Sequence, residues 1–446
     1  MGRYIELVRE QDEPGYRASA RRRGGIYRAF VPDKLADIAF EPDAETTAAV
    51  ADATEVASRV DEYILANGTT PVLSVLSKSE SIASSLIEQI GGSTHNIILA
   101  LHEDEIRNDT IRSVVKNIQL TDEAIARFGD RNRPIVIDDI THLQAALVQY
   151  RLAGRVMGAE YVGIRTIQNR IGGTSVIDAE FVPPPPGYLD GFLLDLVDFI
   201  NEHHHVTPIV AAAFAHAQFE TLHPFADGNG RTGRAIIQGM LRRDGVVRHA
   251  VFPISTVLKG RATDYIDGLN SFRASGSADP KRVNAWVRTF AYALADAAEL
   301  AKKATDDLIY LRDNWHMETQ HRRADAIDDG VIDSVFRNLA VNSASIAAEL
   351  GVTEQAARQS LQRLETVGIL DIRTRQKRHQ YYAPAIVSVI DDIETQYIAA
   401  SQPELILSAD EIETTDETAP RCGAPMPRSR TTCNLRSGHP GHHQHK

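Results

Sequence analysis

The sequence contains very little cysteine and no long apolar run. Among 446 residues there are only two cysteines, Cys422 and Cys433, both near the C-terminus, so a framework of disulfide bonds is excluded. The longest apolar run, near Val206–Phe214, is too short to cross a bilayer and contains Pro208. The first residues mix acids with bases and lack the apolar core of a signal peptide. These absences predict a cytoplasmic protein with no membrane segment.

Positive charge is also scarce. Lysine and arginine total 48 against 60 aspartates and glutamates, which gives a net charge of −12. This balance argues against a general nucleic-acid binder, although it leaves room for a local basic patch. Apolar residues make up 43% of the chain and charged residues 24%, as in ordinary globular proteins. The length predicts about two to four domains.

Helical spacing of apolar residues dominates the chain. We expect helices over residues 43–67, 77–90, 120–158, 187–201, 207–223, 230–243, 262–274 and 283–303, the last running on toward 312. Residues 162–181 differ, because two β-rich runs are split by Gly172-Gly173, which predicts a hairpin. Pro183–Pro186 is an extended spacer. The fold class is therefore predicted to be mainly α.

The sharpest feature is the segment His223–Arg234, which reads HPFADGNGRTGR. Thr207-Pro208 favours the start of the preceding helix, and Pro224 should end it at His223, because a residue before proline avoids helical geometry. The next helix should begin within Gly228–Gly230, and its first amides then have no intrahelical partners. Two glycines allow the backbone to approach phosphate oxygens closely, so this turn predicts an anion-binding nest.

Charged groups surround the predicted nest. Arg231 and Arg234, three residues apart, share a helix face and can both reach phosphates. Asp227 offers the hard oxygen that Mg²⁺ prefers beside nucleotide phosphates, and His223 has a pKa suited to a general base. Each residue alone could belong to a plain turn or cap, but together they indicate a phosphate-binding catalytic loop. The segment has no lysine, which excludes a Walker A loop.

These twelve residues match the motif H-x-F-x-[DE]-G-N-G-R-x-x-R of the Fic family at every fixed position. The sequences AHAQFE at Ala215–Glu220 and RTIQNRIGG at Arg165–Gly173 are similar to the family as well. The resemblance covers roughly residues 35–300. It implies a mainly helical core with a small β-hairpin flap over the site. It also implies transfer of AMP from ATP to a Ser, Thr or Tyr hydroxyl of a target protein.

The resemblance assigns roles to the motif. His223 resembles the base that removes the proton of the target hydroxyl, and Asp227 would hold Mg²⁺ against the α- and β-phosphates. The remaining phosphate ligands would be Gly228, Asn229, Gly230 and Arg231 for the α- and β-phosphates and Arg234 for the γ-phosphate.

Two further parts of the site follow from the same resemblance. Ile171, Gly172 and Gly173 would form the flap tip, which adds the target segment as a strand. Tyr265 is similar to the aromatic residue that lines the adenine pocket.

The helix predicted over residues 77–90 has a divided surface. Its apolar side carries Ile82, Leu86, Ile87 and Ile90, and its polar side carries Ser81, Ser84, Ser85 and Glu88. Without context, the polar side reads as a solvated face. Ser84-x-x-x-Glu88, however, resembles the family's inhibitory motif [ST]-x-x-x-E-[GN], in which the glutamate pairs with the second motif arginine, here Arg234, and blocks the γ-phosphate. Gln89 departs from the usual Gly or Asn.

Residues 330–395 resemble a winged helix-turn-helix. A short helix at Ser343–Leu350, a turn at Gly351 and a helix capped by Thr353 precede two alternating runs that end near Tyr382. The predicted wing tip is basic, with Arg373, Arg375, Lys377, Arg378 and His379. Such a patch suits DNA phosphates, and docking of another protein is the alternative.

The last 25 residues gather potential zinc ligands. Cys422, Cys433, His439 and His443 have the spacing C-x10-C-x5-H-x3-H, which offers four ligands for Zn²⁺. The alternative is a His-rich tail that binds no metal.

The predicted organisation has six parts: a basic N-terminal arm (1–34), a helical region with the inhibitory helix (35–119), the Fic core (120–300), a helical linker (301–329), the winged helix-turn-helix (330–395), and an acidic linker with the Cys/His tail (396–446). The function this predicts is an autoinhibited protein adenylyltransferase that uses ATP and Mg²⁺. The alternatives are a DNA-binding regulator whose Fic domain senses nucleotide, and an enzyme that removes AMP. The sequence names neither the target nor the oligomeric state, so a homo-oligomer stays open.

Overall fold

The computed structural model describes residues 2–9, 24–67, 70–103, 105–203, 205–273, 280–319, 327–375 and 378–401. Its α-helices are α1 (Ala44–Asn67), α2 (Thr70–Ile87), α3 (Thr94–Ala100), α4 (Asp109–Phe128), α5 (Ile137–Val148), α6 (Leu189–Asn201), α7 (Pro208–Leu222), α8 (Asn229–Arg243), α9 (Ile254–Gly260), α10 (Ala262–Phe272), α11 (Pro280–Thr319), α12 (Asp328–Asn338), α13 (Ser343–Leu350), α14 (Glu354–Thr366) and α15 (Pro384–Ser401).

The described strands form three small antiparallel sheets. They are β1 (Gly2–Arg9) with β2 (Gly25–Pro32), β3 (Tyr150–Leu152) with β4 (Arg155–Met157), and β5 (Ala340–Val341), β6 (Asp371–Arg375) and β7 (Arg378–Tyr382) in the order β5-β7-β6. The fold is therefore mainly α, as predicted. None of the helices in the described ranges is long and apolar enough to cross a membrane.

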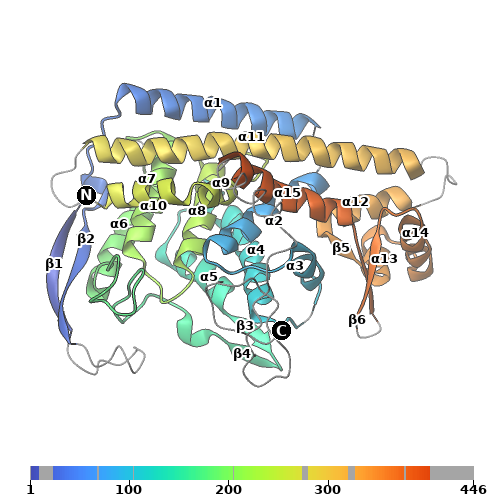
Figure 1. The fold of residues 1–446 in the computed structure, drawn as a ribbon, viewed down its shortest axis with the longest axis horizontal. Helices are drawn as coiled ribbons and strands as arrows, with labels where there is room; N and C mark the ends of the chain where they lie inside the picture. Colours follow the sequence, from blue (N-terminus) through green and yellow to red (C-terminus); the bar gives the residue numbers. More distant parts are fainter. Residues whose placement is uncertain are drawn as a thin grey trace, which may run out of the picture. The chain divides into compact units, whose positions relative to one another are not determined.

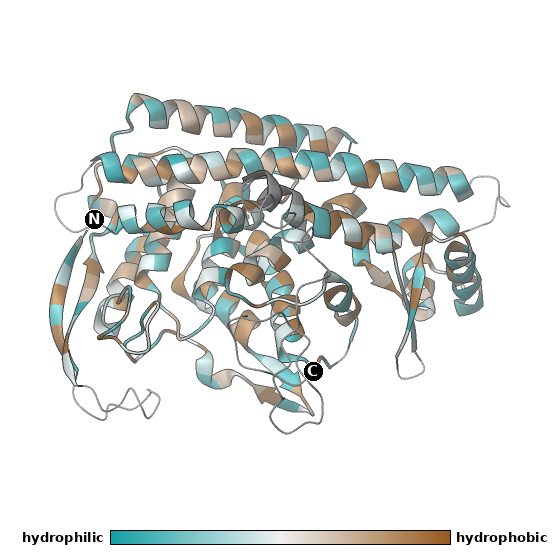
Figure 2. Cartoon of the chain, in the orientation of Figure 1, coloured by the Kyte–Doolittle hydropathy of each residue, from teal (hydrophilic) through white to brown (hydrophobic). Residues whose placement is uncertain are grey.

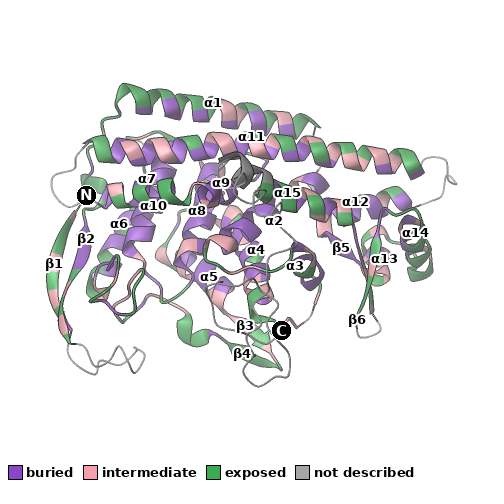
Figure 3. Cartoon of the chain, viewed as in Figure 1, coloured by how far each residue is buried: buried purple, intermediate pink, exposed green. Residues whose placement is uncertain are grey.

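Helix α7 lies at the centre of the core. Its residues are buried continuously from Ile209 to Leu222, and Figure 3 shows this burial along the helix. It begins at Pro208 as predicted, although the side chain of Thr207 makes no capping hydrogen bond. Helices α6, α8 and α11 pack against it. Because α7 carries apolar residues on every face, with a few buried polar residues among them, its neighbours can enclose it, and it fixes the position of the loop that follows.

Two long helices, α1 and α11, lie side by side along one edge of the core (Figure 1). Helix α1 buries Ala49, Ala53, Ala57 and Val60, at helical spacing, and Figure 2 shows hydrophilic and hydrophobic residues mixed along both helices. Helix α11 is 40 residues long. Residues 301–319 of the predicted helical linker therefore continue this core helix.

Helix α2 is buried on its polar side as well as its apolar side. Ser81 and Ser85 are fully buried. The Ser81 hydroxyl donates to the Thr121 hydroxyl at 2.8 Å, and the Asn117 amide donates to the Ser81 carbonyl oxygen at 2.7 Å. Helices α4, α8, α9 and α12 surround it. The polar face is therefore a packed contact with the rest of the protein and not a solvated surface.

The C-terminal elements follow the order that the sequence predicted. Helices α13 and α14 occupy the expected residues, and Gly351 between them adopts a left-handed conformation with φ of 66°. Thr353 caps α14 by accepting a hydrogen bond from the amide of Ala356 at 3.2 Å. Strands β6 and β7 then pair as a hairpin.

These C-terminal elements share one hydrophobic core with α2, α3 and α4. Val72 and Val75 of α2 belong to the same buried cluster as Val331 and Phe336 of α12. At the end of α12 the carbonyl oxygen of Arg337 accepts hydrogen bonds from the Ser74 hydroxyl at 2.8 Å and the Lys78 ammonium at 3.1 Å. The chain through Ile398 is accordingly a single compact unit, and the C-terminal elements contact the helix that carries Ser84.

Strands occupy two segments where the sequence predicted none. Residues 2–9 and 25–32, within the predicted basic N-terminal arm, are paired strands, and the amide of Phe30 donates to the Val182 carbonyl oxygen at 2.9 Å and so joins β2 to a distant segment. Residues 150–157 form a hairpin and not the end of a helix. Ala153 and Gly154 at its turn both have positive φ, the combination that two-residue hairpin turns require.

Candidate active site

The loop between α7 and α8 carries the predicted motif. His223 ends α7 in a left-handed conformation, with φ of 46° and ψ of 58°, which is unusual for a residue other than glycine. Phe225 is fully buried. The side-chain amide of Asn229 accepts from the amide of Phe225 and donates to its carbonyl oxygen, both at 2.9 Å. Asn229, predicted as part of the nest, thus uses its side chain to hold the shape of the loop.

The N-terminus of α8 faces the carboxylate of Glu88. Gly228, with φ of 85°, precedes the helix, and its carbonyl oxygen accepts the first intrahelical hydrogen bond from Thr232 at 3.0 Å. A Cβ atom on Gly230 would collide with Glu88 Oε1. The first amides of a helix attract anions. Glu88 therefore places a negative charge where the sequence predicts phosphate.

Arg234 is the centre of the contact with α2. It is 1% exposed. Its Nε donates to the Ser84 hydroxyl at 3.0 Å, and its Nη2 donates to the Ser84 carbonyl oxygen at 2.7 Å and to Glu88 Oε1 at 2.9 Å. Burial alone would raise the pKa of Glu88, but Arg234, with smaller contributions from Arg231 and His223, holds that pKa below its ordinary value. The carboxylate is therefore ionised at neutral pH.

Glu88 lies just beyond the end of α2, which ends at Ile87 and not at residue 90. The amide of Gln89 donates to the Leu86 carbonyl oxygen at 2.9 Å, and that of Ile90 donates to Ser85 at 3.0 Å. These are the two bonds of a Schellman motif, whose left-handed position favours glycine or asparagine. Gln89 occupies it with φ of 59°. The departure at Gln89 noted in the sequence is thus a site of backbone strain.

The other charged motif residues, Arg231 and Asp227, differ in burial. Arg231 is 3% exposed and its Nη1 donates to the Ser113 hydroxyl at 2.6 Å. The Asp227 side chain is 66% exposed and lies 3.9 Å from Arg231 Nη2. No group of three or more metal-binding side chains occurs in the described part of the chain. A single exposed carboxylate still fits Mg²⁺ that is held mainly by phosphates and water.

His223 is held in its neutral form. Burial and the nearby cations Arg273 and Arg165 together lower the pKa of His223 to about 3, and Glu88 raises it by less. Its Nδ1 is buried and makes no hydrogen bond within the described ranges. The imidazole is therefore neutral at physiological pH, but a pKa of about 3 makes it a weaker base than the histidine of ordinary pKa that the sequence predicted.

The predicted flap is a compact loop rather than a regular hairpin. Ile171 and Phe181 form an isolated bridge with backbone hydrogen bonds of 2.8 and 3.1 Å, and Gly172 and Gly173 at the tip both have positive φ. The carboxylate of Asp178 accepts hydrogen bonds from the backbone and hydroxyls of Thr174 and Ser175. These bonds close the loop and replace a longer ladder.

Tyr265 of α10 lies in a buried polar cluster beside α7. It is 7% exposed, and its hydroxyl is 2.8 Å from Nε2 of His216 on α7. Glu220 belongs to the same cluster, where burial raises its pKa to about 7. A Cβ atom on Gly233 would collide with the Glu220 carboxylate. Sequence reasoning did not identify His216 or Glu220, although polar residues within an otherwise apolar helix were a usable signal.

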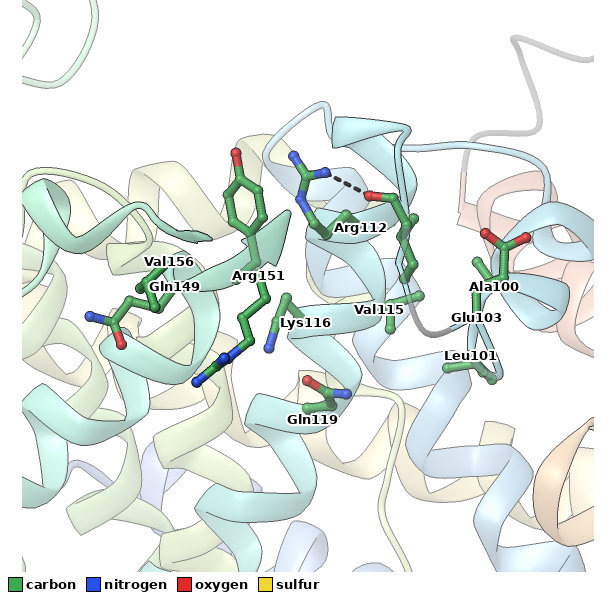
Figure 4. Close-up of a pocket in the computed structure, with 12 residues that line it drawn as sticks. Ala100, Leu101, Glu103, Arg112, Val115, Lys116, Gln119, Gln149, Arg151 and Val156 are labelled. Carbon is green, nitrogen blue, oxygen red and sulfur yellow. Dashed lines mark hydrogen bonds between the residues drawn. The ribbon is translucent and has the colours of Figure 1, made fainter. Parts of the chain in front are cut away.

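A cavity of about 500 Å³ lies beside α4 and is lined by residues of α3, α4 and the hairpin of β3 and β4 (Figure 4). Figure 4 shows Lys116, Gln119 and Arg151 among its lining residues. The lining carries the cations Arg112, Lys116 and Arg151 and the anion Glu103. These residues lie outside the predicted motif.

Some predicted residues fall outside the described ranges. They are Lys377 at the predicted wing tip and the proposed zinc ligands Cys422, Cys433, His439 and His443. The zinc site therefore stays a prediction.

Comparison with known proteins agrees with this geometry. Residues 134–241 match the model of the Fic/DOC family. This segment is a Fic domain. The protein adenylyltransferase fic-1 of Caenorhabditis elegans is 33% identical over 141 residues, which cover 31% of this chain and 25% of that protein. The protein adenylyltransferase Fic of Drosophila melanogaster is 34% identical over 109 residues, 24% of this chain and 21% of the relative.

The chain thus spans about a quarter of the length of these curated relatives. Among solved structures, a Fic family protein from Desulfovibrio desulfuricans G20 is 21% identical, with a TM-score of 0.44, and the match covers 77% of this chain and 98% of that one. The Fic domain of the present chain includes α5 to α8 and so contains the loop from His223 to Arg234.

Proposed function

We propose that the Fic domain transfers AMP from ATP to a hydroxyl group of a target protein. The observation that carries this proposal is the single loop that joins a neutral base, His223, to the anion-attracting start of α8 and to Arg231 and Arg234. The relatives named protein adenylyltransferase share this part of the chain, which supports the same reaction.

In this proposal the phosphates of ATP lie over the start of α8. The amides of Gly228–Gly230 and the guanidinium of Arg231 hold the α- and β-phosphates, and Arg234 holds the γ-phosphate. Mg²⁺ bound through Asp227 would neutralise charge on the phosphates. Tyr265, which contacts His216 of α7, is the proposed neighbour of adenine on the basis of the family resemblance.

The chemical step needs a base and good alignment. His223 takes the proton of the target hydroxyl, the oxygen attacks the α-phosphorus, and the bond from this phosphorus to the bridging oxygen of the β-phosphate breaks, which releases pyrophosphate. The target segment is proposed to pair with the flap at Ile171–Gly173, which would align its hydroxyl. Positioning and charge neutralisation then provide most of the rate enhancement.

The conformation of the chain corresponds to an inhibited state in this proposal. Glu88 and Ser84 occupy the donors of Arg234, so the γ-phosphate has no free partner there. The carboxylate also sits against Gly230, where a phosphate would lie. An activating signal must therefore move the end of α2 away from α8.

One observation supports a second role for the C-terminal elements. Arg373 and His379 are exposed on the hairpin of β6 and β7, which suits contact with DNA phosphates. A DNA-binding regulator with a nucleotide-sensing Fic domain is therefore the alternative, and removal of AMP from a modified protein is another. Incubation with ATP labelled at the α- or γ-phosphate separates them, because only AMP transfer leaves the α-label on protein.

A further inference from the structure

Two buried arginines flank His223 outside the motif. Arg165 precedes the flap and is 5% exposed, and Arg273 follows α10 and is 8% exposed. Both lower the pKa of His223. Burial of a cation is costly unless its donors are satisfied, so two such residues beside one histidine call for an explanation. Their contacts supply one.

Arg165 joins four backbone carbonyl groups. Its Nε donates to the His223 carbonyl oxygen at 2.8 Å, and its Nη2 donates to Leu222 at 3.3 Å and to Pro184 at 2.5 Å. Its Nη1 donates to Ile167 at 3.2 Å. The first two carbonyls lie at the end of α7, where helices lack intrahelical donors and favour a cation. The other two belong to the segments that enter and leave the flap.

Arg273 makes a second connection between the same parts. Its Nε donates to the Thr221 hydroxyl at 3.2 Å, two residues before His223. Its guanidinium carbon lies 4.3 Å from the ring centroid of Phe181, whose backbone pairs with Ile171 at the flap. Arg273 thus spans from the end of α7 to the returning arm of the flap.

We propose that Arg165 and Arg273 are positioning residues, which fasten the flap to the end of α7 and hold His223 in its left-handed backbone conformation. The inference rests on the proposed function to the extent that His223 is the base. Such a conformation is strained and persists only where neighbours over-determine it. Lysine cannot replace Arg165, because one ammonium cannot reach four carbonyl groups that surround a planar fork.

The same cations control the charge of His223. Arg273 and Arg165 disfavour the imidazolium, and Glu88 and the backbone of Glu220 favour it. Burial is the largest cause of the lowered pKa, and the two cations add to it. Loss of the Arg273 charge should therefore raise the pKa of His223 toward its ordinary value, even though the ring stays in place.

The test uses two variants and two readouts on the protein without substrates. In Arg273→Met the charge is lost and the apolar contact with Phe181 is retained, so the titration midpoint of His223, measured by NMR of selectively labelled histidine, should move upward toward about 6.5. In Arg165→Lys the charge is retained and the fork is lost. Exchange of the Ile171 and Phe181 amides should accelerate by about tenfold or more, as expected when hydrogen bonds worth about 1.5 kcal/mol are lost.

Arg243→Met is the matched control. Arg243 is equally buried and donates to the carbonyl oxygens of Asp130 at 2.6 Å and Arg133 at 3.0 Å, but it lies at the other end of α8. This variant should change neither readout.

Two results together would overturn the proposal. They are a titration midpoint of His223 that is unchanged in folded Arg273→Met, and amide exchange at the flap that is unchanged in Arg165→Lys. If Arg165→Lys does not fold, Arg273→Met alone decides. Both readouts are independent of turnover. A protein that transfers no AMP but shows the shifted midpoint would contradict the proposed function and still support this inference.

Discussion

Nη2 of Arg234 lies 2.9 Å from Oε1 of Glu88 and 2.7 Å from the carbonyl oxygen of Ser84. One guanidinium is thus shared between the end of α2 and the first turns of α8. If Arg234 binds the γ-phosphate as proposed, ATP must compete with Glu88 for this arginine. The energy of the contact should therefore set the basal activity.

Removal of the Glu88 carboxylate should increase the proposed AMP transfer. A hydrogen bond between charged groups is worth about 1.5–3 kcal/mol, so Glu88→Gly should raise AMP transfer by about 10- to 100-fold. Glu88→Asp, with a shorter side chain, should fall between this variant and the parent. The double change Glu88→Gly with Arg234→Ala should lose most of the gain. Rates measured with labelled ATP decide this, and equal rates for Glu88→Gly and the parent would make α2 a structural cover only.

Relief of strain at Gln89 should have the opposite effect. A left-handed conformation costs about 1–2 kcal/mol for a residue other than glycine, so Gln89→Gly should stabilise the docked end of α2 and lower basal AMP transfer by about fivefold. Ala153→Gly is the control, because Ala153 also has positive φ but lies in the turn between β3 and β4. Both variants should raise the melting temperature. If AMP transfer falls in both variants, or in neither, then the strain at Gln89 does not control the inhibitory contact.

The contact between α2 and α12 should influence inhibition. The double change Ser74→Ala with Lys78→Met removes two donors to the Arg337 carbonyl oxygen and should raise AMP transfer by about 2- to 10-fold, because each such bond contributes roughly 0.5–1.5 kcal/mol. Lys302→Met, which removes a pair with Asp306 within α11, is the control. Activity equal to the parent in the double variant would mean that α2 is held without the C-terminal elements.

The buried carboxyl group of Glu220 should make stability depend on pH. Its pKa is raised to about 7 in the folded protein from 4.5, so the folded state binds more protons between these values, and the free energy of unfolding falls as pH rises through this window. Glu220→Gln has no such loss. The free energy of unfolding of this variant, relative to that of the parent, should therefore rise by on the order of 3 kcal/mol from pH 4.5 to pH 8. Urea unfolding at several pH values measures this difference, with exposed Glu202→Gln expected to track the parent.

The motif was predictable because its requirements are local. The end of α7 before Pro224 and the start of α8 within Gly228–Gly230 follow from neighbouring residues, and the structure has both where the sequence predicted them. The contact of Glu88 with Arg234 could be predicted only from the family resemblance, because 146 residues separate the two in the sequence.

Other features of the site could not be predicted from local pattern. The four carbonyl partners of Arg165 come from three separate segments, and Phe30 meets Val182, which is distant in sequence. Only tertiary structure brings such groups together. The burial of Ser81 and Ser85 was not predictable for the same reason, because an amphipathic pattern shows a polar face but not what covers it.

Transfer of AMP with His223 as the base is tested most directly by mass analysis of Glu88→Gly after incubation with Mg²⁺ and ATP labelled at either the α- or the γ-phosphate. We predict that protein gains the α-label and the mass of AMP, and that adding His223→Ala lowers this rate by about 10²–10⁴-fold, the usual contribution of a general base, while ATP still binds. Label that arrives from the γ-phosphate alone, or a rate that does not depend on His223, would contradict this mechanism.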